Sequence, residues 1–462
     1  MPSPPAKPLP VVTAGGIKAF LGGGQRRAGF KEALEAHVTI KAPEDRELYE
    51  QFVAAVGLAK AELDAAPESQ ELWIPENGMI CQLQSFLAEQ AQSQAATEAA
   101  VAVAPERLVL SAESLEAQFD DRDIGGWALS FFGWWRRLAK ADFREQPIAE
   151  HLPIPIPDDT SLALFADWGV GPIYGARAIR ETIDESRRIK DPLYASIHLG
   201  DIYYAGTEKE VEQNLLANFP SLRSDVRRLA LNGNHEMYGG ARGYYQALDV
   251  FGQPQSYFAL QNRYFTIIAL DTAYDDFGLA GQQLEWVKRI LNQAGASRKI
   301  IFLSHHQPFS AFEPSNSAKL ASILSPILES GRILAWYWGH EHRCVVYDRH
   351  AKWGTLGRCI GHGGYPYFRV DDKLSVRFDP GGKRDILMPP VHHLDHSLWY
   401  SFPNNAQSPS GIILGDDNRY LREEHARYGA QGFVVLKLKD AQAQEEFLRP
   451  DGTPILIQGL TP

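Results

Sequence analysis

Six short apolar runs in the middle of the chain, each followed at once by polar residues, constrain the fold more than any other feature. They read SLALFADWG, PLYASIHLGD, VRRLALNGNHE, FTIIALDT, KIIFLSHHQP and RILAWYWGHEH. Continuous apolarity over about five residues favours strands buried on both faces, and the intervening GQQLEWVKRILNQ favours an amphipathic helix. This alternation predicts an α/β fold.

The chain divides into three regions by composition. Residues 1–25 are rich in Pro and Gly and are expected to be disordered, because they can bury little apolar surface. Residues 26–155 are expected to be mainly helical, and they end in the Pro-rich linker PIAEHLPIPIPDD, since repeated proline cannot continue a helix. Residues 156–462 then form the α/β domain.

Charge and cysteine content exclude several classes of protein. The 462 residues carry a formal net charge of -11, which argues against a nucleic-acid partner. Three scattered cysteines are too few for a disulfide framework and indicate a reducing compartment. The N-terminus lacks the pattern of a secretory signal, and no apolar stretch is long enough to span a membrane. These features predict a cytoplasmic location; the oligomeric state stays open.

Polar side chains stand at the carboxyl end of each apolar run. In open α/β sheets ligands bind beyond these strand ends, so we expect the side chains to converge. Glycines beside them allow the backbone to turn sharply there. The side chains are Asp167, Asp201, Asn234, His235, Asp271, His305, His306, His340 and His342, and the glycines are Gly169, Gly200, Gly233 and Gly339.

The donor set at these strand ends consists of carboxylate, amide and imidazole groups without thiolate. Such hard or borderline donors suit Zn, Mn or Fe. Two cations about 3.5 to 4 Å apart can share a bridging carboxylate and act together in phosphoester hydrolysis. The number of donors allows two metal ions.

The motifs DWG, GDIYY, GNHE, SHH and GHEH occur in the order found in the calcineurin-like metallophosphoesterase superfamily. More narrowly, they resemble the purple acid phosphatase pattern of DxG, GDxxY, GNH[DE], xxxH and GHxH. The resemblance covers about residues 160 to 440 and implies a four-layer α/β/β/α sandwich. It implies two metal ions, Fe(III) with Fe(II), Zn or Mn, and hydrolysis of a small phosphomonoester or phosphodiester by a metal-bound hydroxide.

Metal ligands follow from the resemblance, motif by motif. The residues that resemble the ligands of a ferric site are Asp167, Asp201, Tyr204 and His342. Those that resemble the divalent site are the bridging Asp201 with Asn234, His305 and His340. The histidine of GNHE, His235, resembles the residue that contacts phosphate or protonates the leaving oxygen, and His306 and His362 are further catalytic candidates.

Several of these residues also have structural interpretations. A hydrogen bond within the loop is about as probable for His362 as a phosphate contact, and core packing is favoured for His198 and Tyr203. Turn formation is favoured for Asp271, and a packed or solvated loop for His392, His393 and His396.

The sequence also departs from the resembled family. Purple acid phosphatases are typically secreted, and their N-terminal β-sandwich has no counterpart here. Gly169 replaces the histidine of the DxH version of the first motif, a loss that Tyr204 could compensate. Alternatives to a general phosphohydrolase are a phosphodiesterase for cyclic nucleotides or glycerophosphodiesters, a nuclease, or a non-catalytic scaffold on this fold.

Overall fold

The computed structural model describes most of the chain from residue 138 to residue 460. The gaps in this range are 172–173, 186–192, 222–223, 368, 370–375, 378–384, 387–389, 395–396 and 421–427. Nearer the N-terminus it describes 11–12, 17, 51, 54–55, 62, 75, 77–95, 109–110, 131 and 135.

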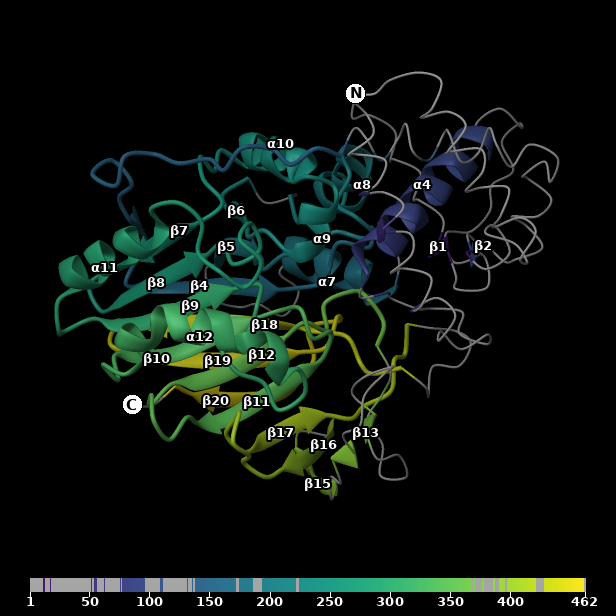
Figure 1. Ribbon diagram of the computed structural model, residues 1–462. Helices are drawn as coiled ribbons and strands as arrows, with labels where there is room; N and C mark the ends of the chain where they lie inside the picture. Colours follow the sequence, from purple (N-terminus) through teal and green to yellow (C-terminus); the bar gives the residue numbers. More distant parts are fainter. Residues whose placement is uncertain are drawn as a thin grey trace.

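A six-stranded sheet forms one half of the domain (Figure 1). Its strands β4, β5 and β6 are parallel, and β18 runs antiparallel to β4. In spatial order the strands are β20 (Pro454–Gly459), β19 (Gln442–Leu448), β18 (Phe433–Lys439), β4 (Asp159–Phe165), β5 (Leu193–His198) and β6 (Arg227–Ala230).

A ten-stranded sheet forms the other half, with β8, β9, β10 and β12 parallel at its centre. In spatial order its strands are β15 (Pro390–Leu394), β16 (Ser397–Phe402), β17 (Gly411–Leu414), β11 (Cys344–Arg349), β12 (Leu356–Ile360), β10 (Ile333–Trp338), β9 (Lys299–Ser304), β8 (Phe265–Leu270), β7 (Phe258–Gln261) and β3 (Ile154–Pro155). In a separate two-stranded sheet, β13 (Val376–Arg377) pairs antiparallel with β14 (Asp385–Ile386).

Three buried clusters define the layers. One lies between the two sheets and includes Leu164, Ile197 and Ile301. The second packs α11 (Gln283–Ala294) and α12 (Pro314–Leu328) on the ten-stranded sheet, and the third packs α7 (Tyr174–Glu185) and α10 (Arg242–Phe251) on the six-stranded sheet. The predicted four-layer α/β/β/α sandwich is confirmed, and all six apolar runs form strands.

The N-terminal region is described only in part. Its main element is α4 (Gly78–Ala95), which lies beside α9 (Asn234–Tyr238) in Figure 1; β1 (Val11–Val12) pairs with β2 (Val109–Leu110). Most of residues 1–25 lie outside the described residues. The predicted boundary at 155 stays a prediction, although β3 already joins the sheet before it. No described helix is long and apolar enough to cross a membrane.

Candidate metal centre

The predicted side chains gather where the strands of the two sheets end. Asp167 follows β4, Asp201 follows β5, and Asn234 and His235 open α9 just after β6. From the other sheet, His305 follows β9, and His340 and His342 follow β10. Because parallel strands end at the same edge, residues distant in sequence meet here.

Four donors form the first cluster. The Tyr203 hydroxyl lies 3.0 Å from Asp167 Oδ1, 3.2 Å from Asp201 Oδ2 and 2.7 Å from His342 Nε2. His342 Nε2 is also 3.3 Å from Asp167 Oδ1. The hydroxyl has one proton and cannot donate to both carboxylates at once, while His342 Nε2 donates or accepts according to its tautomer. Asp167, Asp201 and His342 form a group that could hold a cation, and the Tyr203 hydroxyl lies within hydrogen-bond distance of all three.

The tyrosine in this cluster differs from the one that the motif spacing predicted. Tyr203, expected in packing or the pocket wall, places its hydroxyl among the donors. The backbone N–H of Tyr204 donates to Glu210, and its ring packs near Tyr365, with 6.3 Å between centroids. Motif spacing counts residues from Asp201, whereas the path of the loop decides which ring turns inward. The structure thus places the Tyr203 hydroxyl among the donors, and metal ligation by Tyr204 stays a prediction.

The second cluster surrounds the side-chain oxygen of Asn234. This Oδ1 lies 3.0 Å from His305 Nε2 and 2.9 Å from His340 Nδ1. His305 Nε2 is also 3.2 Å from Asp201 Oδ1, so Asp201 touches both clusters. The His305 Nδ1 lies 2.9 Å from the carbonyl of Leu199, which favours a proton on Nδ1 and leaves Nε2 as a donor to a metal.

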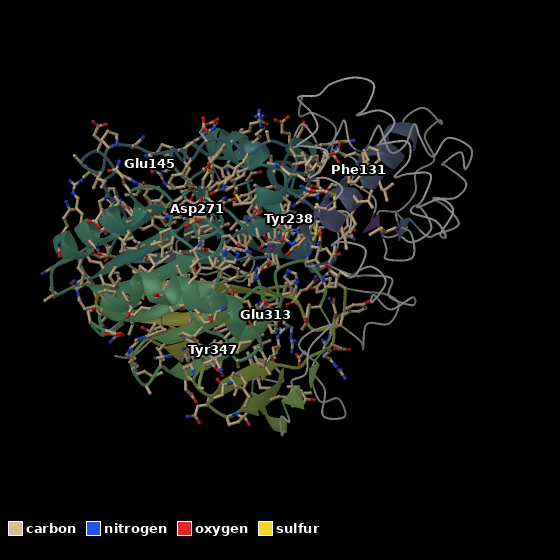
Figure 2. All side chains as sticks on the ribbon, viewed as in Figure 1. Phe131, Glu145, Tyr238, Asp271, Glu313 and Tyr347 are labelled. Carbon is tan, nitrogen blue, oxygen red and sulfur yellow. The ribbon has the colours of Figure 1, made fainter. Side chains whose placement is uncertain are left out.

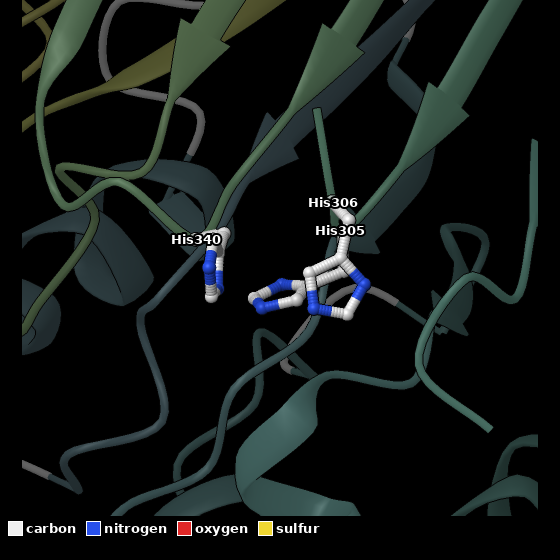
Figure 3. Close-up of side chains that lie close together, drawn as sticks. All are labelled: His305, His306 and His340. Atoms are coloured by element: carbon white, nitrogen blue, oxygen red, sulfur yellow. The ribbon is translucent and has the colours of Figure 1, made fainter. Parts of the chain in front are cut away.

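His306 lies beside the second cluster, as Figure 3 shows. Its ring centroid is 4.9 Å from that of His305 and 4.8 Å from that of His340. Nδ1 is 2.9 Å from the carbonyl of Thr272, while the buried Nε2 has no hydrogen-bond partner among the described residues. Together with His305 and His340, His306 forms a group that could hold a cation.

The other two catalytic candidates occupy different surroundings. The backbone N–H of His235 donates to Asp201 Oδ1 at 3.1 Å, and its Nε2 lies 3.7 Å from Asp201 Oδ2. His362 is buried against Gly432, whose N–H donates to the His362 carbonyl at 3.0 Å. The described contacts join His235, but not the His362 ring, to the predicted ligands; a catalytic role for His362 stays a prediction.

Four predicted ligands adopt a left-handed backbone. The φ angles are 54° at Asp167, 74° at Asp201, 69° at His340 and 48° at His342. Non-glycine residues rarely adopt such angles, which cost about 1–3 kcal/mol each and cluster at functional sites. The fold thus maintains strained backbone at the residues that present the donors.

Charge at the centre is concentrated and buried. Burial raises the pKa of Asp167 well above its usual value, and the Asp201 carboxylate raises it further. Burial also acts to raise the pKa of Asp201, but His305 and His235 hold it well below its usual range. Burial acts to lower the pKa of His305, yet Asp201 raises it to about 9. Cations would stabilise both carboxylates in their charged form.

The donor set fits two metal ions. Asp167, Asp201, Tyr203 and His342 supply oxygen and nitrogen at the first site. Asp201, Asn234, His305 and His340 supply the second, with His306 adjacent. Carboxylate, phenolate, amide and imidazole without thiolate suit Fe, Zn or Mn.

Two buried glutamates support the ligands, and sequence reasoning missed both. Glu236 accepts hydrogen bonds from the backbone N–H of Asp201, at 3.1 Å, and of Gly233, at 3.2 Å. Glu341 accepts from Ser310 Oγ at 2.7 Å and from Trp338 Nε1 at 3.1 Å. Both stand inside quoted motifs, GNHE and GHEH, where an acidic residue next to ligands was the available signal.

The residues with structural interpretations lie as follows. His198 is fully buried, with its ring near those of Phe165 and Trp168. Asp271 Oδ1 accepts from the N–H groups of Ala273 and Tyr274, which is turn formation. His392 and His393 lie in β15, and His396 is outside the described residues.

Residues 160–344 match the family called calcineurin-like phosphoesterase. Among curated proteins, none matches the chain.

Matches among solved structures include GAP50, the anchor in the inner membrane complex of Plasmodium. It is 14% identical, and the match covers 66% of this chain and 89% of that chain with a TM-score of 0.43. A single mutant of Vps29 from Entamoeba histolytica has 9% identity, covering 65% and 99% with a TM-score of 0.28. The 5'-nucleotidase from Candida albicans SC5314 has 14% identity, covering 46% of each chain with a TM-score of 0.27. The segment that matches the calcineurin-like phosphoesterase family, residues 160–344, contains every predicted metal ligand.

Proposed function

We propose that the protein is a dinuclear metal-dependent phosphohydrolase that cleaves phosphomonoesters or phosphodiesters. One observation carries the proposal: Asp201 contacts both donor clusters, through Oδ2 to Tyr203 and through Oδ1 to His305. A carboxylate shared between two clusters is the arrangement that a pair of cations requires. The match of residues 160–344 to a phosphoesterase family supports the same chemistry.

Asp201 and His235 have distinct roles in this reaction. Bound cations would lower the pKa of a water molecule and neutralise charge on the phosphoryl oxygens. Asp201 holds the two sites at a fixed separation. His235 Nδ1 contacts the Tyr204 carbonyl, which favours the tautomer with its proton there, and Nε2 lies on the Asp201 side. Donation from Nε2 to a phosphoryl oxygen or to the leaving group requires the doubly protonated imidazolium, and in that form His235 is placed for either role.

A scaffold on this fold is the alternative from a different class of protein. Loss of catalysis removes the need for metal ligands, so a scaffold would be expected to show gaps in the donor set. Here both clusters have their donors, and Glu236 and Glu341 brace the loops that carry them. The complete donor set favours an enzyme.

Metal content, a visible spectrum and turnover of aryl phosphomonoesters and phosphodiesters test the proposal. We expect about two metal ions per chain, and turnover that Asp201→Asn lowers by at least about 100-fold, because even residues that only orient ligands contribute about 10–100-fold. Asp249→Asn, which alters an exposed carboxylate paired with Arg144, is the matched control. No metal uptake and no turnover after reconstitution with Fe, Zn or Mn would refute the proposal that the protein is a phosphohydrolase.

The diester arm of the panel separates the remaining alternatives. Cyclic nucleotides, glycerophosphodiesters and single-stranded DNA each represent one of them. Turnover confined to the diesters would replace a general phosphohydrolase by a dedicated phosphodiesterase or nuclease. A small phosphoester substrate and a cytoplasmic location stay predictions.

A further inference from the structure

Helix α4, which lies outside the family-matched segment, presents three polar side chains to the domain. Gln82, Ser85 and Glu89 are spaced three and four residues apart, so they lie along one face of the helix. All three make hydrogen bonds to Thr207, Glu210 or Tyr238, which lie in the segments that follow the candidate ligands after β5 and β6. Phe86, by contrast, packs on Phe131, with 5.3 Å between ring centroids.

Ser85 contacts the loop of Tyr203 through a buried carboxylate. Its Oγ donates to Glu210 Oε1 at 2.7 Å, and Glu210 has no exposed surface. Glu210 also accepts the backbone N–H groups of Tyr204 at 2.5 Å, Ala205 at 3.0 Å and Thr207 at 3.1 Å. One carboxylate therefore holds most of the loop that follows Tyr203, and Ser85 holds that carboxylate.

Glu89 and Gln82, on either side of Ser85 along α4, add further hydrogen bonds to the domain. Thr207 Oγ1 donates to Glu89 Oε1 at 2.9 Å, which adds a second bond to the same loop. Gln82 Nε2 donates to the carbonyl of Tyr238 at 2.8 Å, at the end of α9. The Tyr238 hydroxyl accepts from Asn234 Nδ2 at 3.0 Å. Figure 2 shows Tyr238 on the side of the domain that faces Phe131 and α4.

We propose that α4 is a positioning element of the metal centre, with Ser85 acting through Glu210 on Tyr203 and Gln82 acting through Tyr238 on Asn234. The proposal rests on the metal-dependent function above. Metal sites need their ligands held to within about 0.5 Å, and residues that orient ligands contribute about 10–100-fold to affinity or activity. The N-terminal region thereby gains a role in catalysis without touching substrate.

Ser85→Ala in the full-length protein is the first test. We expect metal affinity, measured by competition with a chelator, to fall about 10-fold or more. Peptides spanning residues 204–207 should exchange their amide hydrogens faster, because the loss of Ser85 releases Glu210. Ser85→Thr keeps the hydroxyl and should restore both values.

Ser325→Ala is the matched control, because Ser325 Oγ makes a bond of the same length, 2.7 Å, to Glu329 on the exposed side of α12. If Ser85 had a merely structural role, Ser85→Ala would lower the unfolding temperature and leave metal affinity unchanged. That result for Ser85→Ala would overturn the proposal.

Gln82→Met provides an independent variant if Ser85→Ala fails to fold. It removes the hydrogen bond to the Tyr238 carbonyl while keeping a side chain of similar length. We expect weaker binding of metal at the site that contains Asn234. Unchanged affinity here would refute the α4 proposal alone, whereas a wild-type protein without metal would refute both it and the proposed function.

Discussion

Two adjacent tyrosines illustrate how single atoms decide the chemistry of this site. Tyr203 brings its hydroxyl within 3.2 Å of donors on Asp167, Asp201 and His342. Tyr204 contributes its backbone instead: its N–H donates to Glu210, and its carbonyl oxygen contacts His235 Nδ1. Free tyrosine has a pKa of about 10 and is therefore protonated at neutral pH. A strongly Lewis-acidic ion beside the hydroxyl would stabilise the phenolate. Tyr203 is therefore the residue whose ligation of iron should be tested.

Replacing Tyr203 by Phe should remove one donor from the first site. We expect metal affinity to fall by at least about 10-fold, and in an iron protein the tyrosinate charge-transfer band should disappear. Absorption spectra of iron-loaded protein measure the second effect. Tyr204→Phe should keep the band; a band lost in that variant and kept in Tyr203→Phe would restore the assignment from motif spacing.

At the scale of elements, the turn from β6 into α9 depends on the absence of a side chain. A Cβ on Gly233 would lie 2.2 Å from Asp201 Oδ1 and 2.4 Å from Asp201 N. Backbone and ligand would both have to shift, because real Cβ atoms do not approach so closely. Glycine is thus required here by the close approach of two strand ends.

Gly233→Ala should accordingly displace Asp201 and abolish metal-dependent turnover, although the sheet itself remains. Metal content and kcat are the measurements. In Gly295→Ala, a Cβ meets nothing within 4 Å, but φ 64° and ψ -168° lie in a region almost exclusive to glycine, so we expect a loss of about 1–3 kcal/mol of stability with normal turnover. Normal metal binding by Gly233→Ala would contradict the crowding argument.

The linker element contains a histidine that should make stability depend on pH. His151 packs between Tyr257 and Trp286, with centroid distances of 4.7 Å and 4.6 Å. Burial lowers the pKa of His151 to about 4. Below about pH 6.5 the unfolded chain binds a proton at His151 that the folded chain does not, so acid favours unfolding until the pH falls below 4.

His151→Phe should remove that contribution while keeping an aromatic ring between its neighbours. We expect the wild type to lose about 2 kcal/mol more than the variant between pH 7 and pH 5. Urea unfolding at both pH values measures the difference. Equal losses in the two proteins would show that His151 is protonated in the folded state as readily as in the unfolded state.

At the scale of the whole molecule, a buried ion pair joins the two sheets. Arg358 on β12 donates from Nε to Glu445 Oε1 on β19 at 2.7 Å. Tyr337 on β10 donates to the other oxygen of Glu445 at 2.6 Å. All three side chains are buried, and the carboxylate accepts from two partners on the opposite sheet and from Gln458 Nε2 on its own sheet, at 2.7 Å.

Glu445→Ala should leave the Arg358 charge buried without its partner. Breaking such a pair from one side costs about 3–5 kcal/mol, so the urea midpoint should fall markedly while the metal centre is unaffected in the fraction that stays folded. Glu285→Ala, which removes an exposed partner of Lys288, should change stability little. Similar losses in both variants would mean that the cross-sheet pair is solvated.

By itself the sequence determined the six central strands and the polar residues that follow them, among them most of the candidate ligands. Apolar runs such as FTIIALDT can only be buried on both faces, and a polar residue after such a run must lie at the strand end. For that reason Asp167, Asp201, Asn234 and His305 could be named before any contact was seen.

Only the tertiary structure decided which tyrosine faces the donors, which glutamates brace them, and that α4 contacts the centre. These outcomes depend on the direction of a side chain in a loop and on contacts between distant segments, such as Ser85 with Glu210. Residue spacing measures distance along the chain and carries no information about either, so it assigned Tyr204 where the folded loop presents Tyr203.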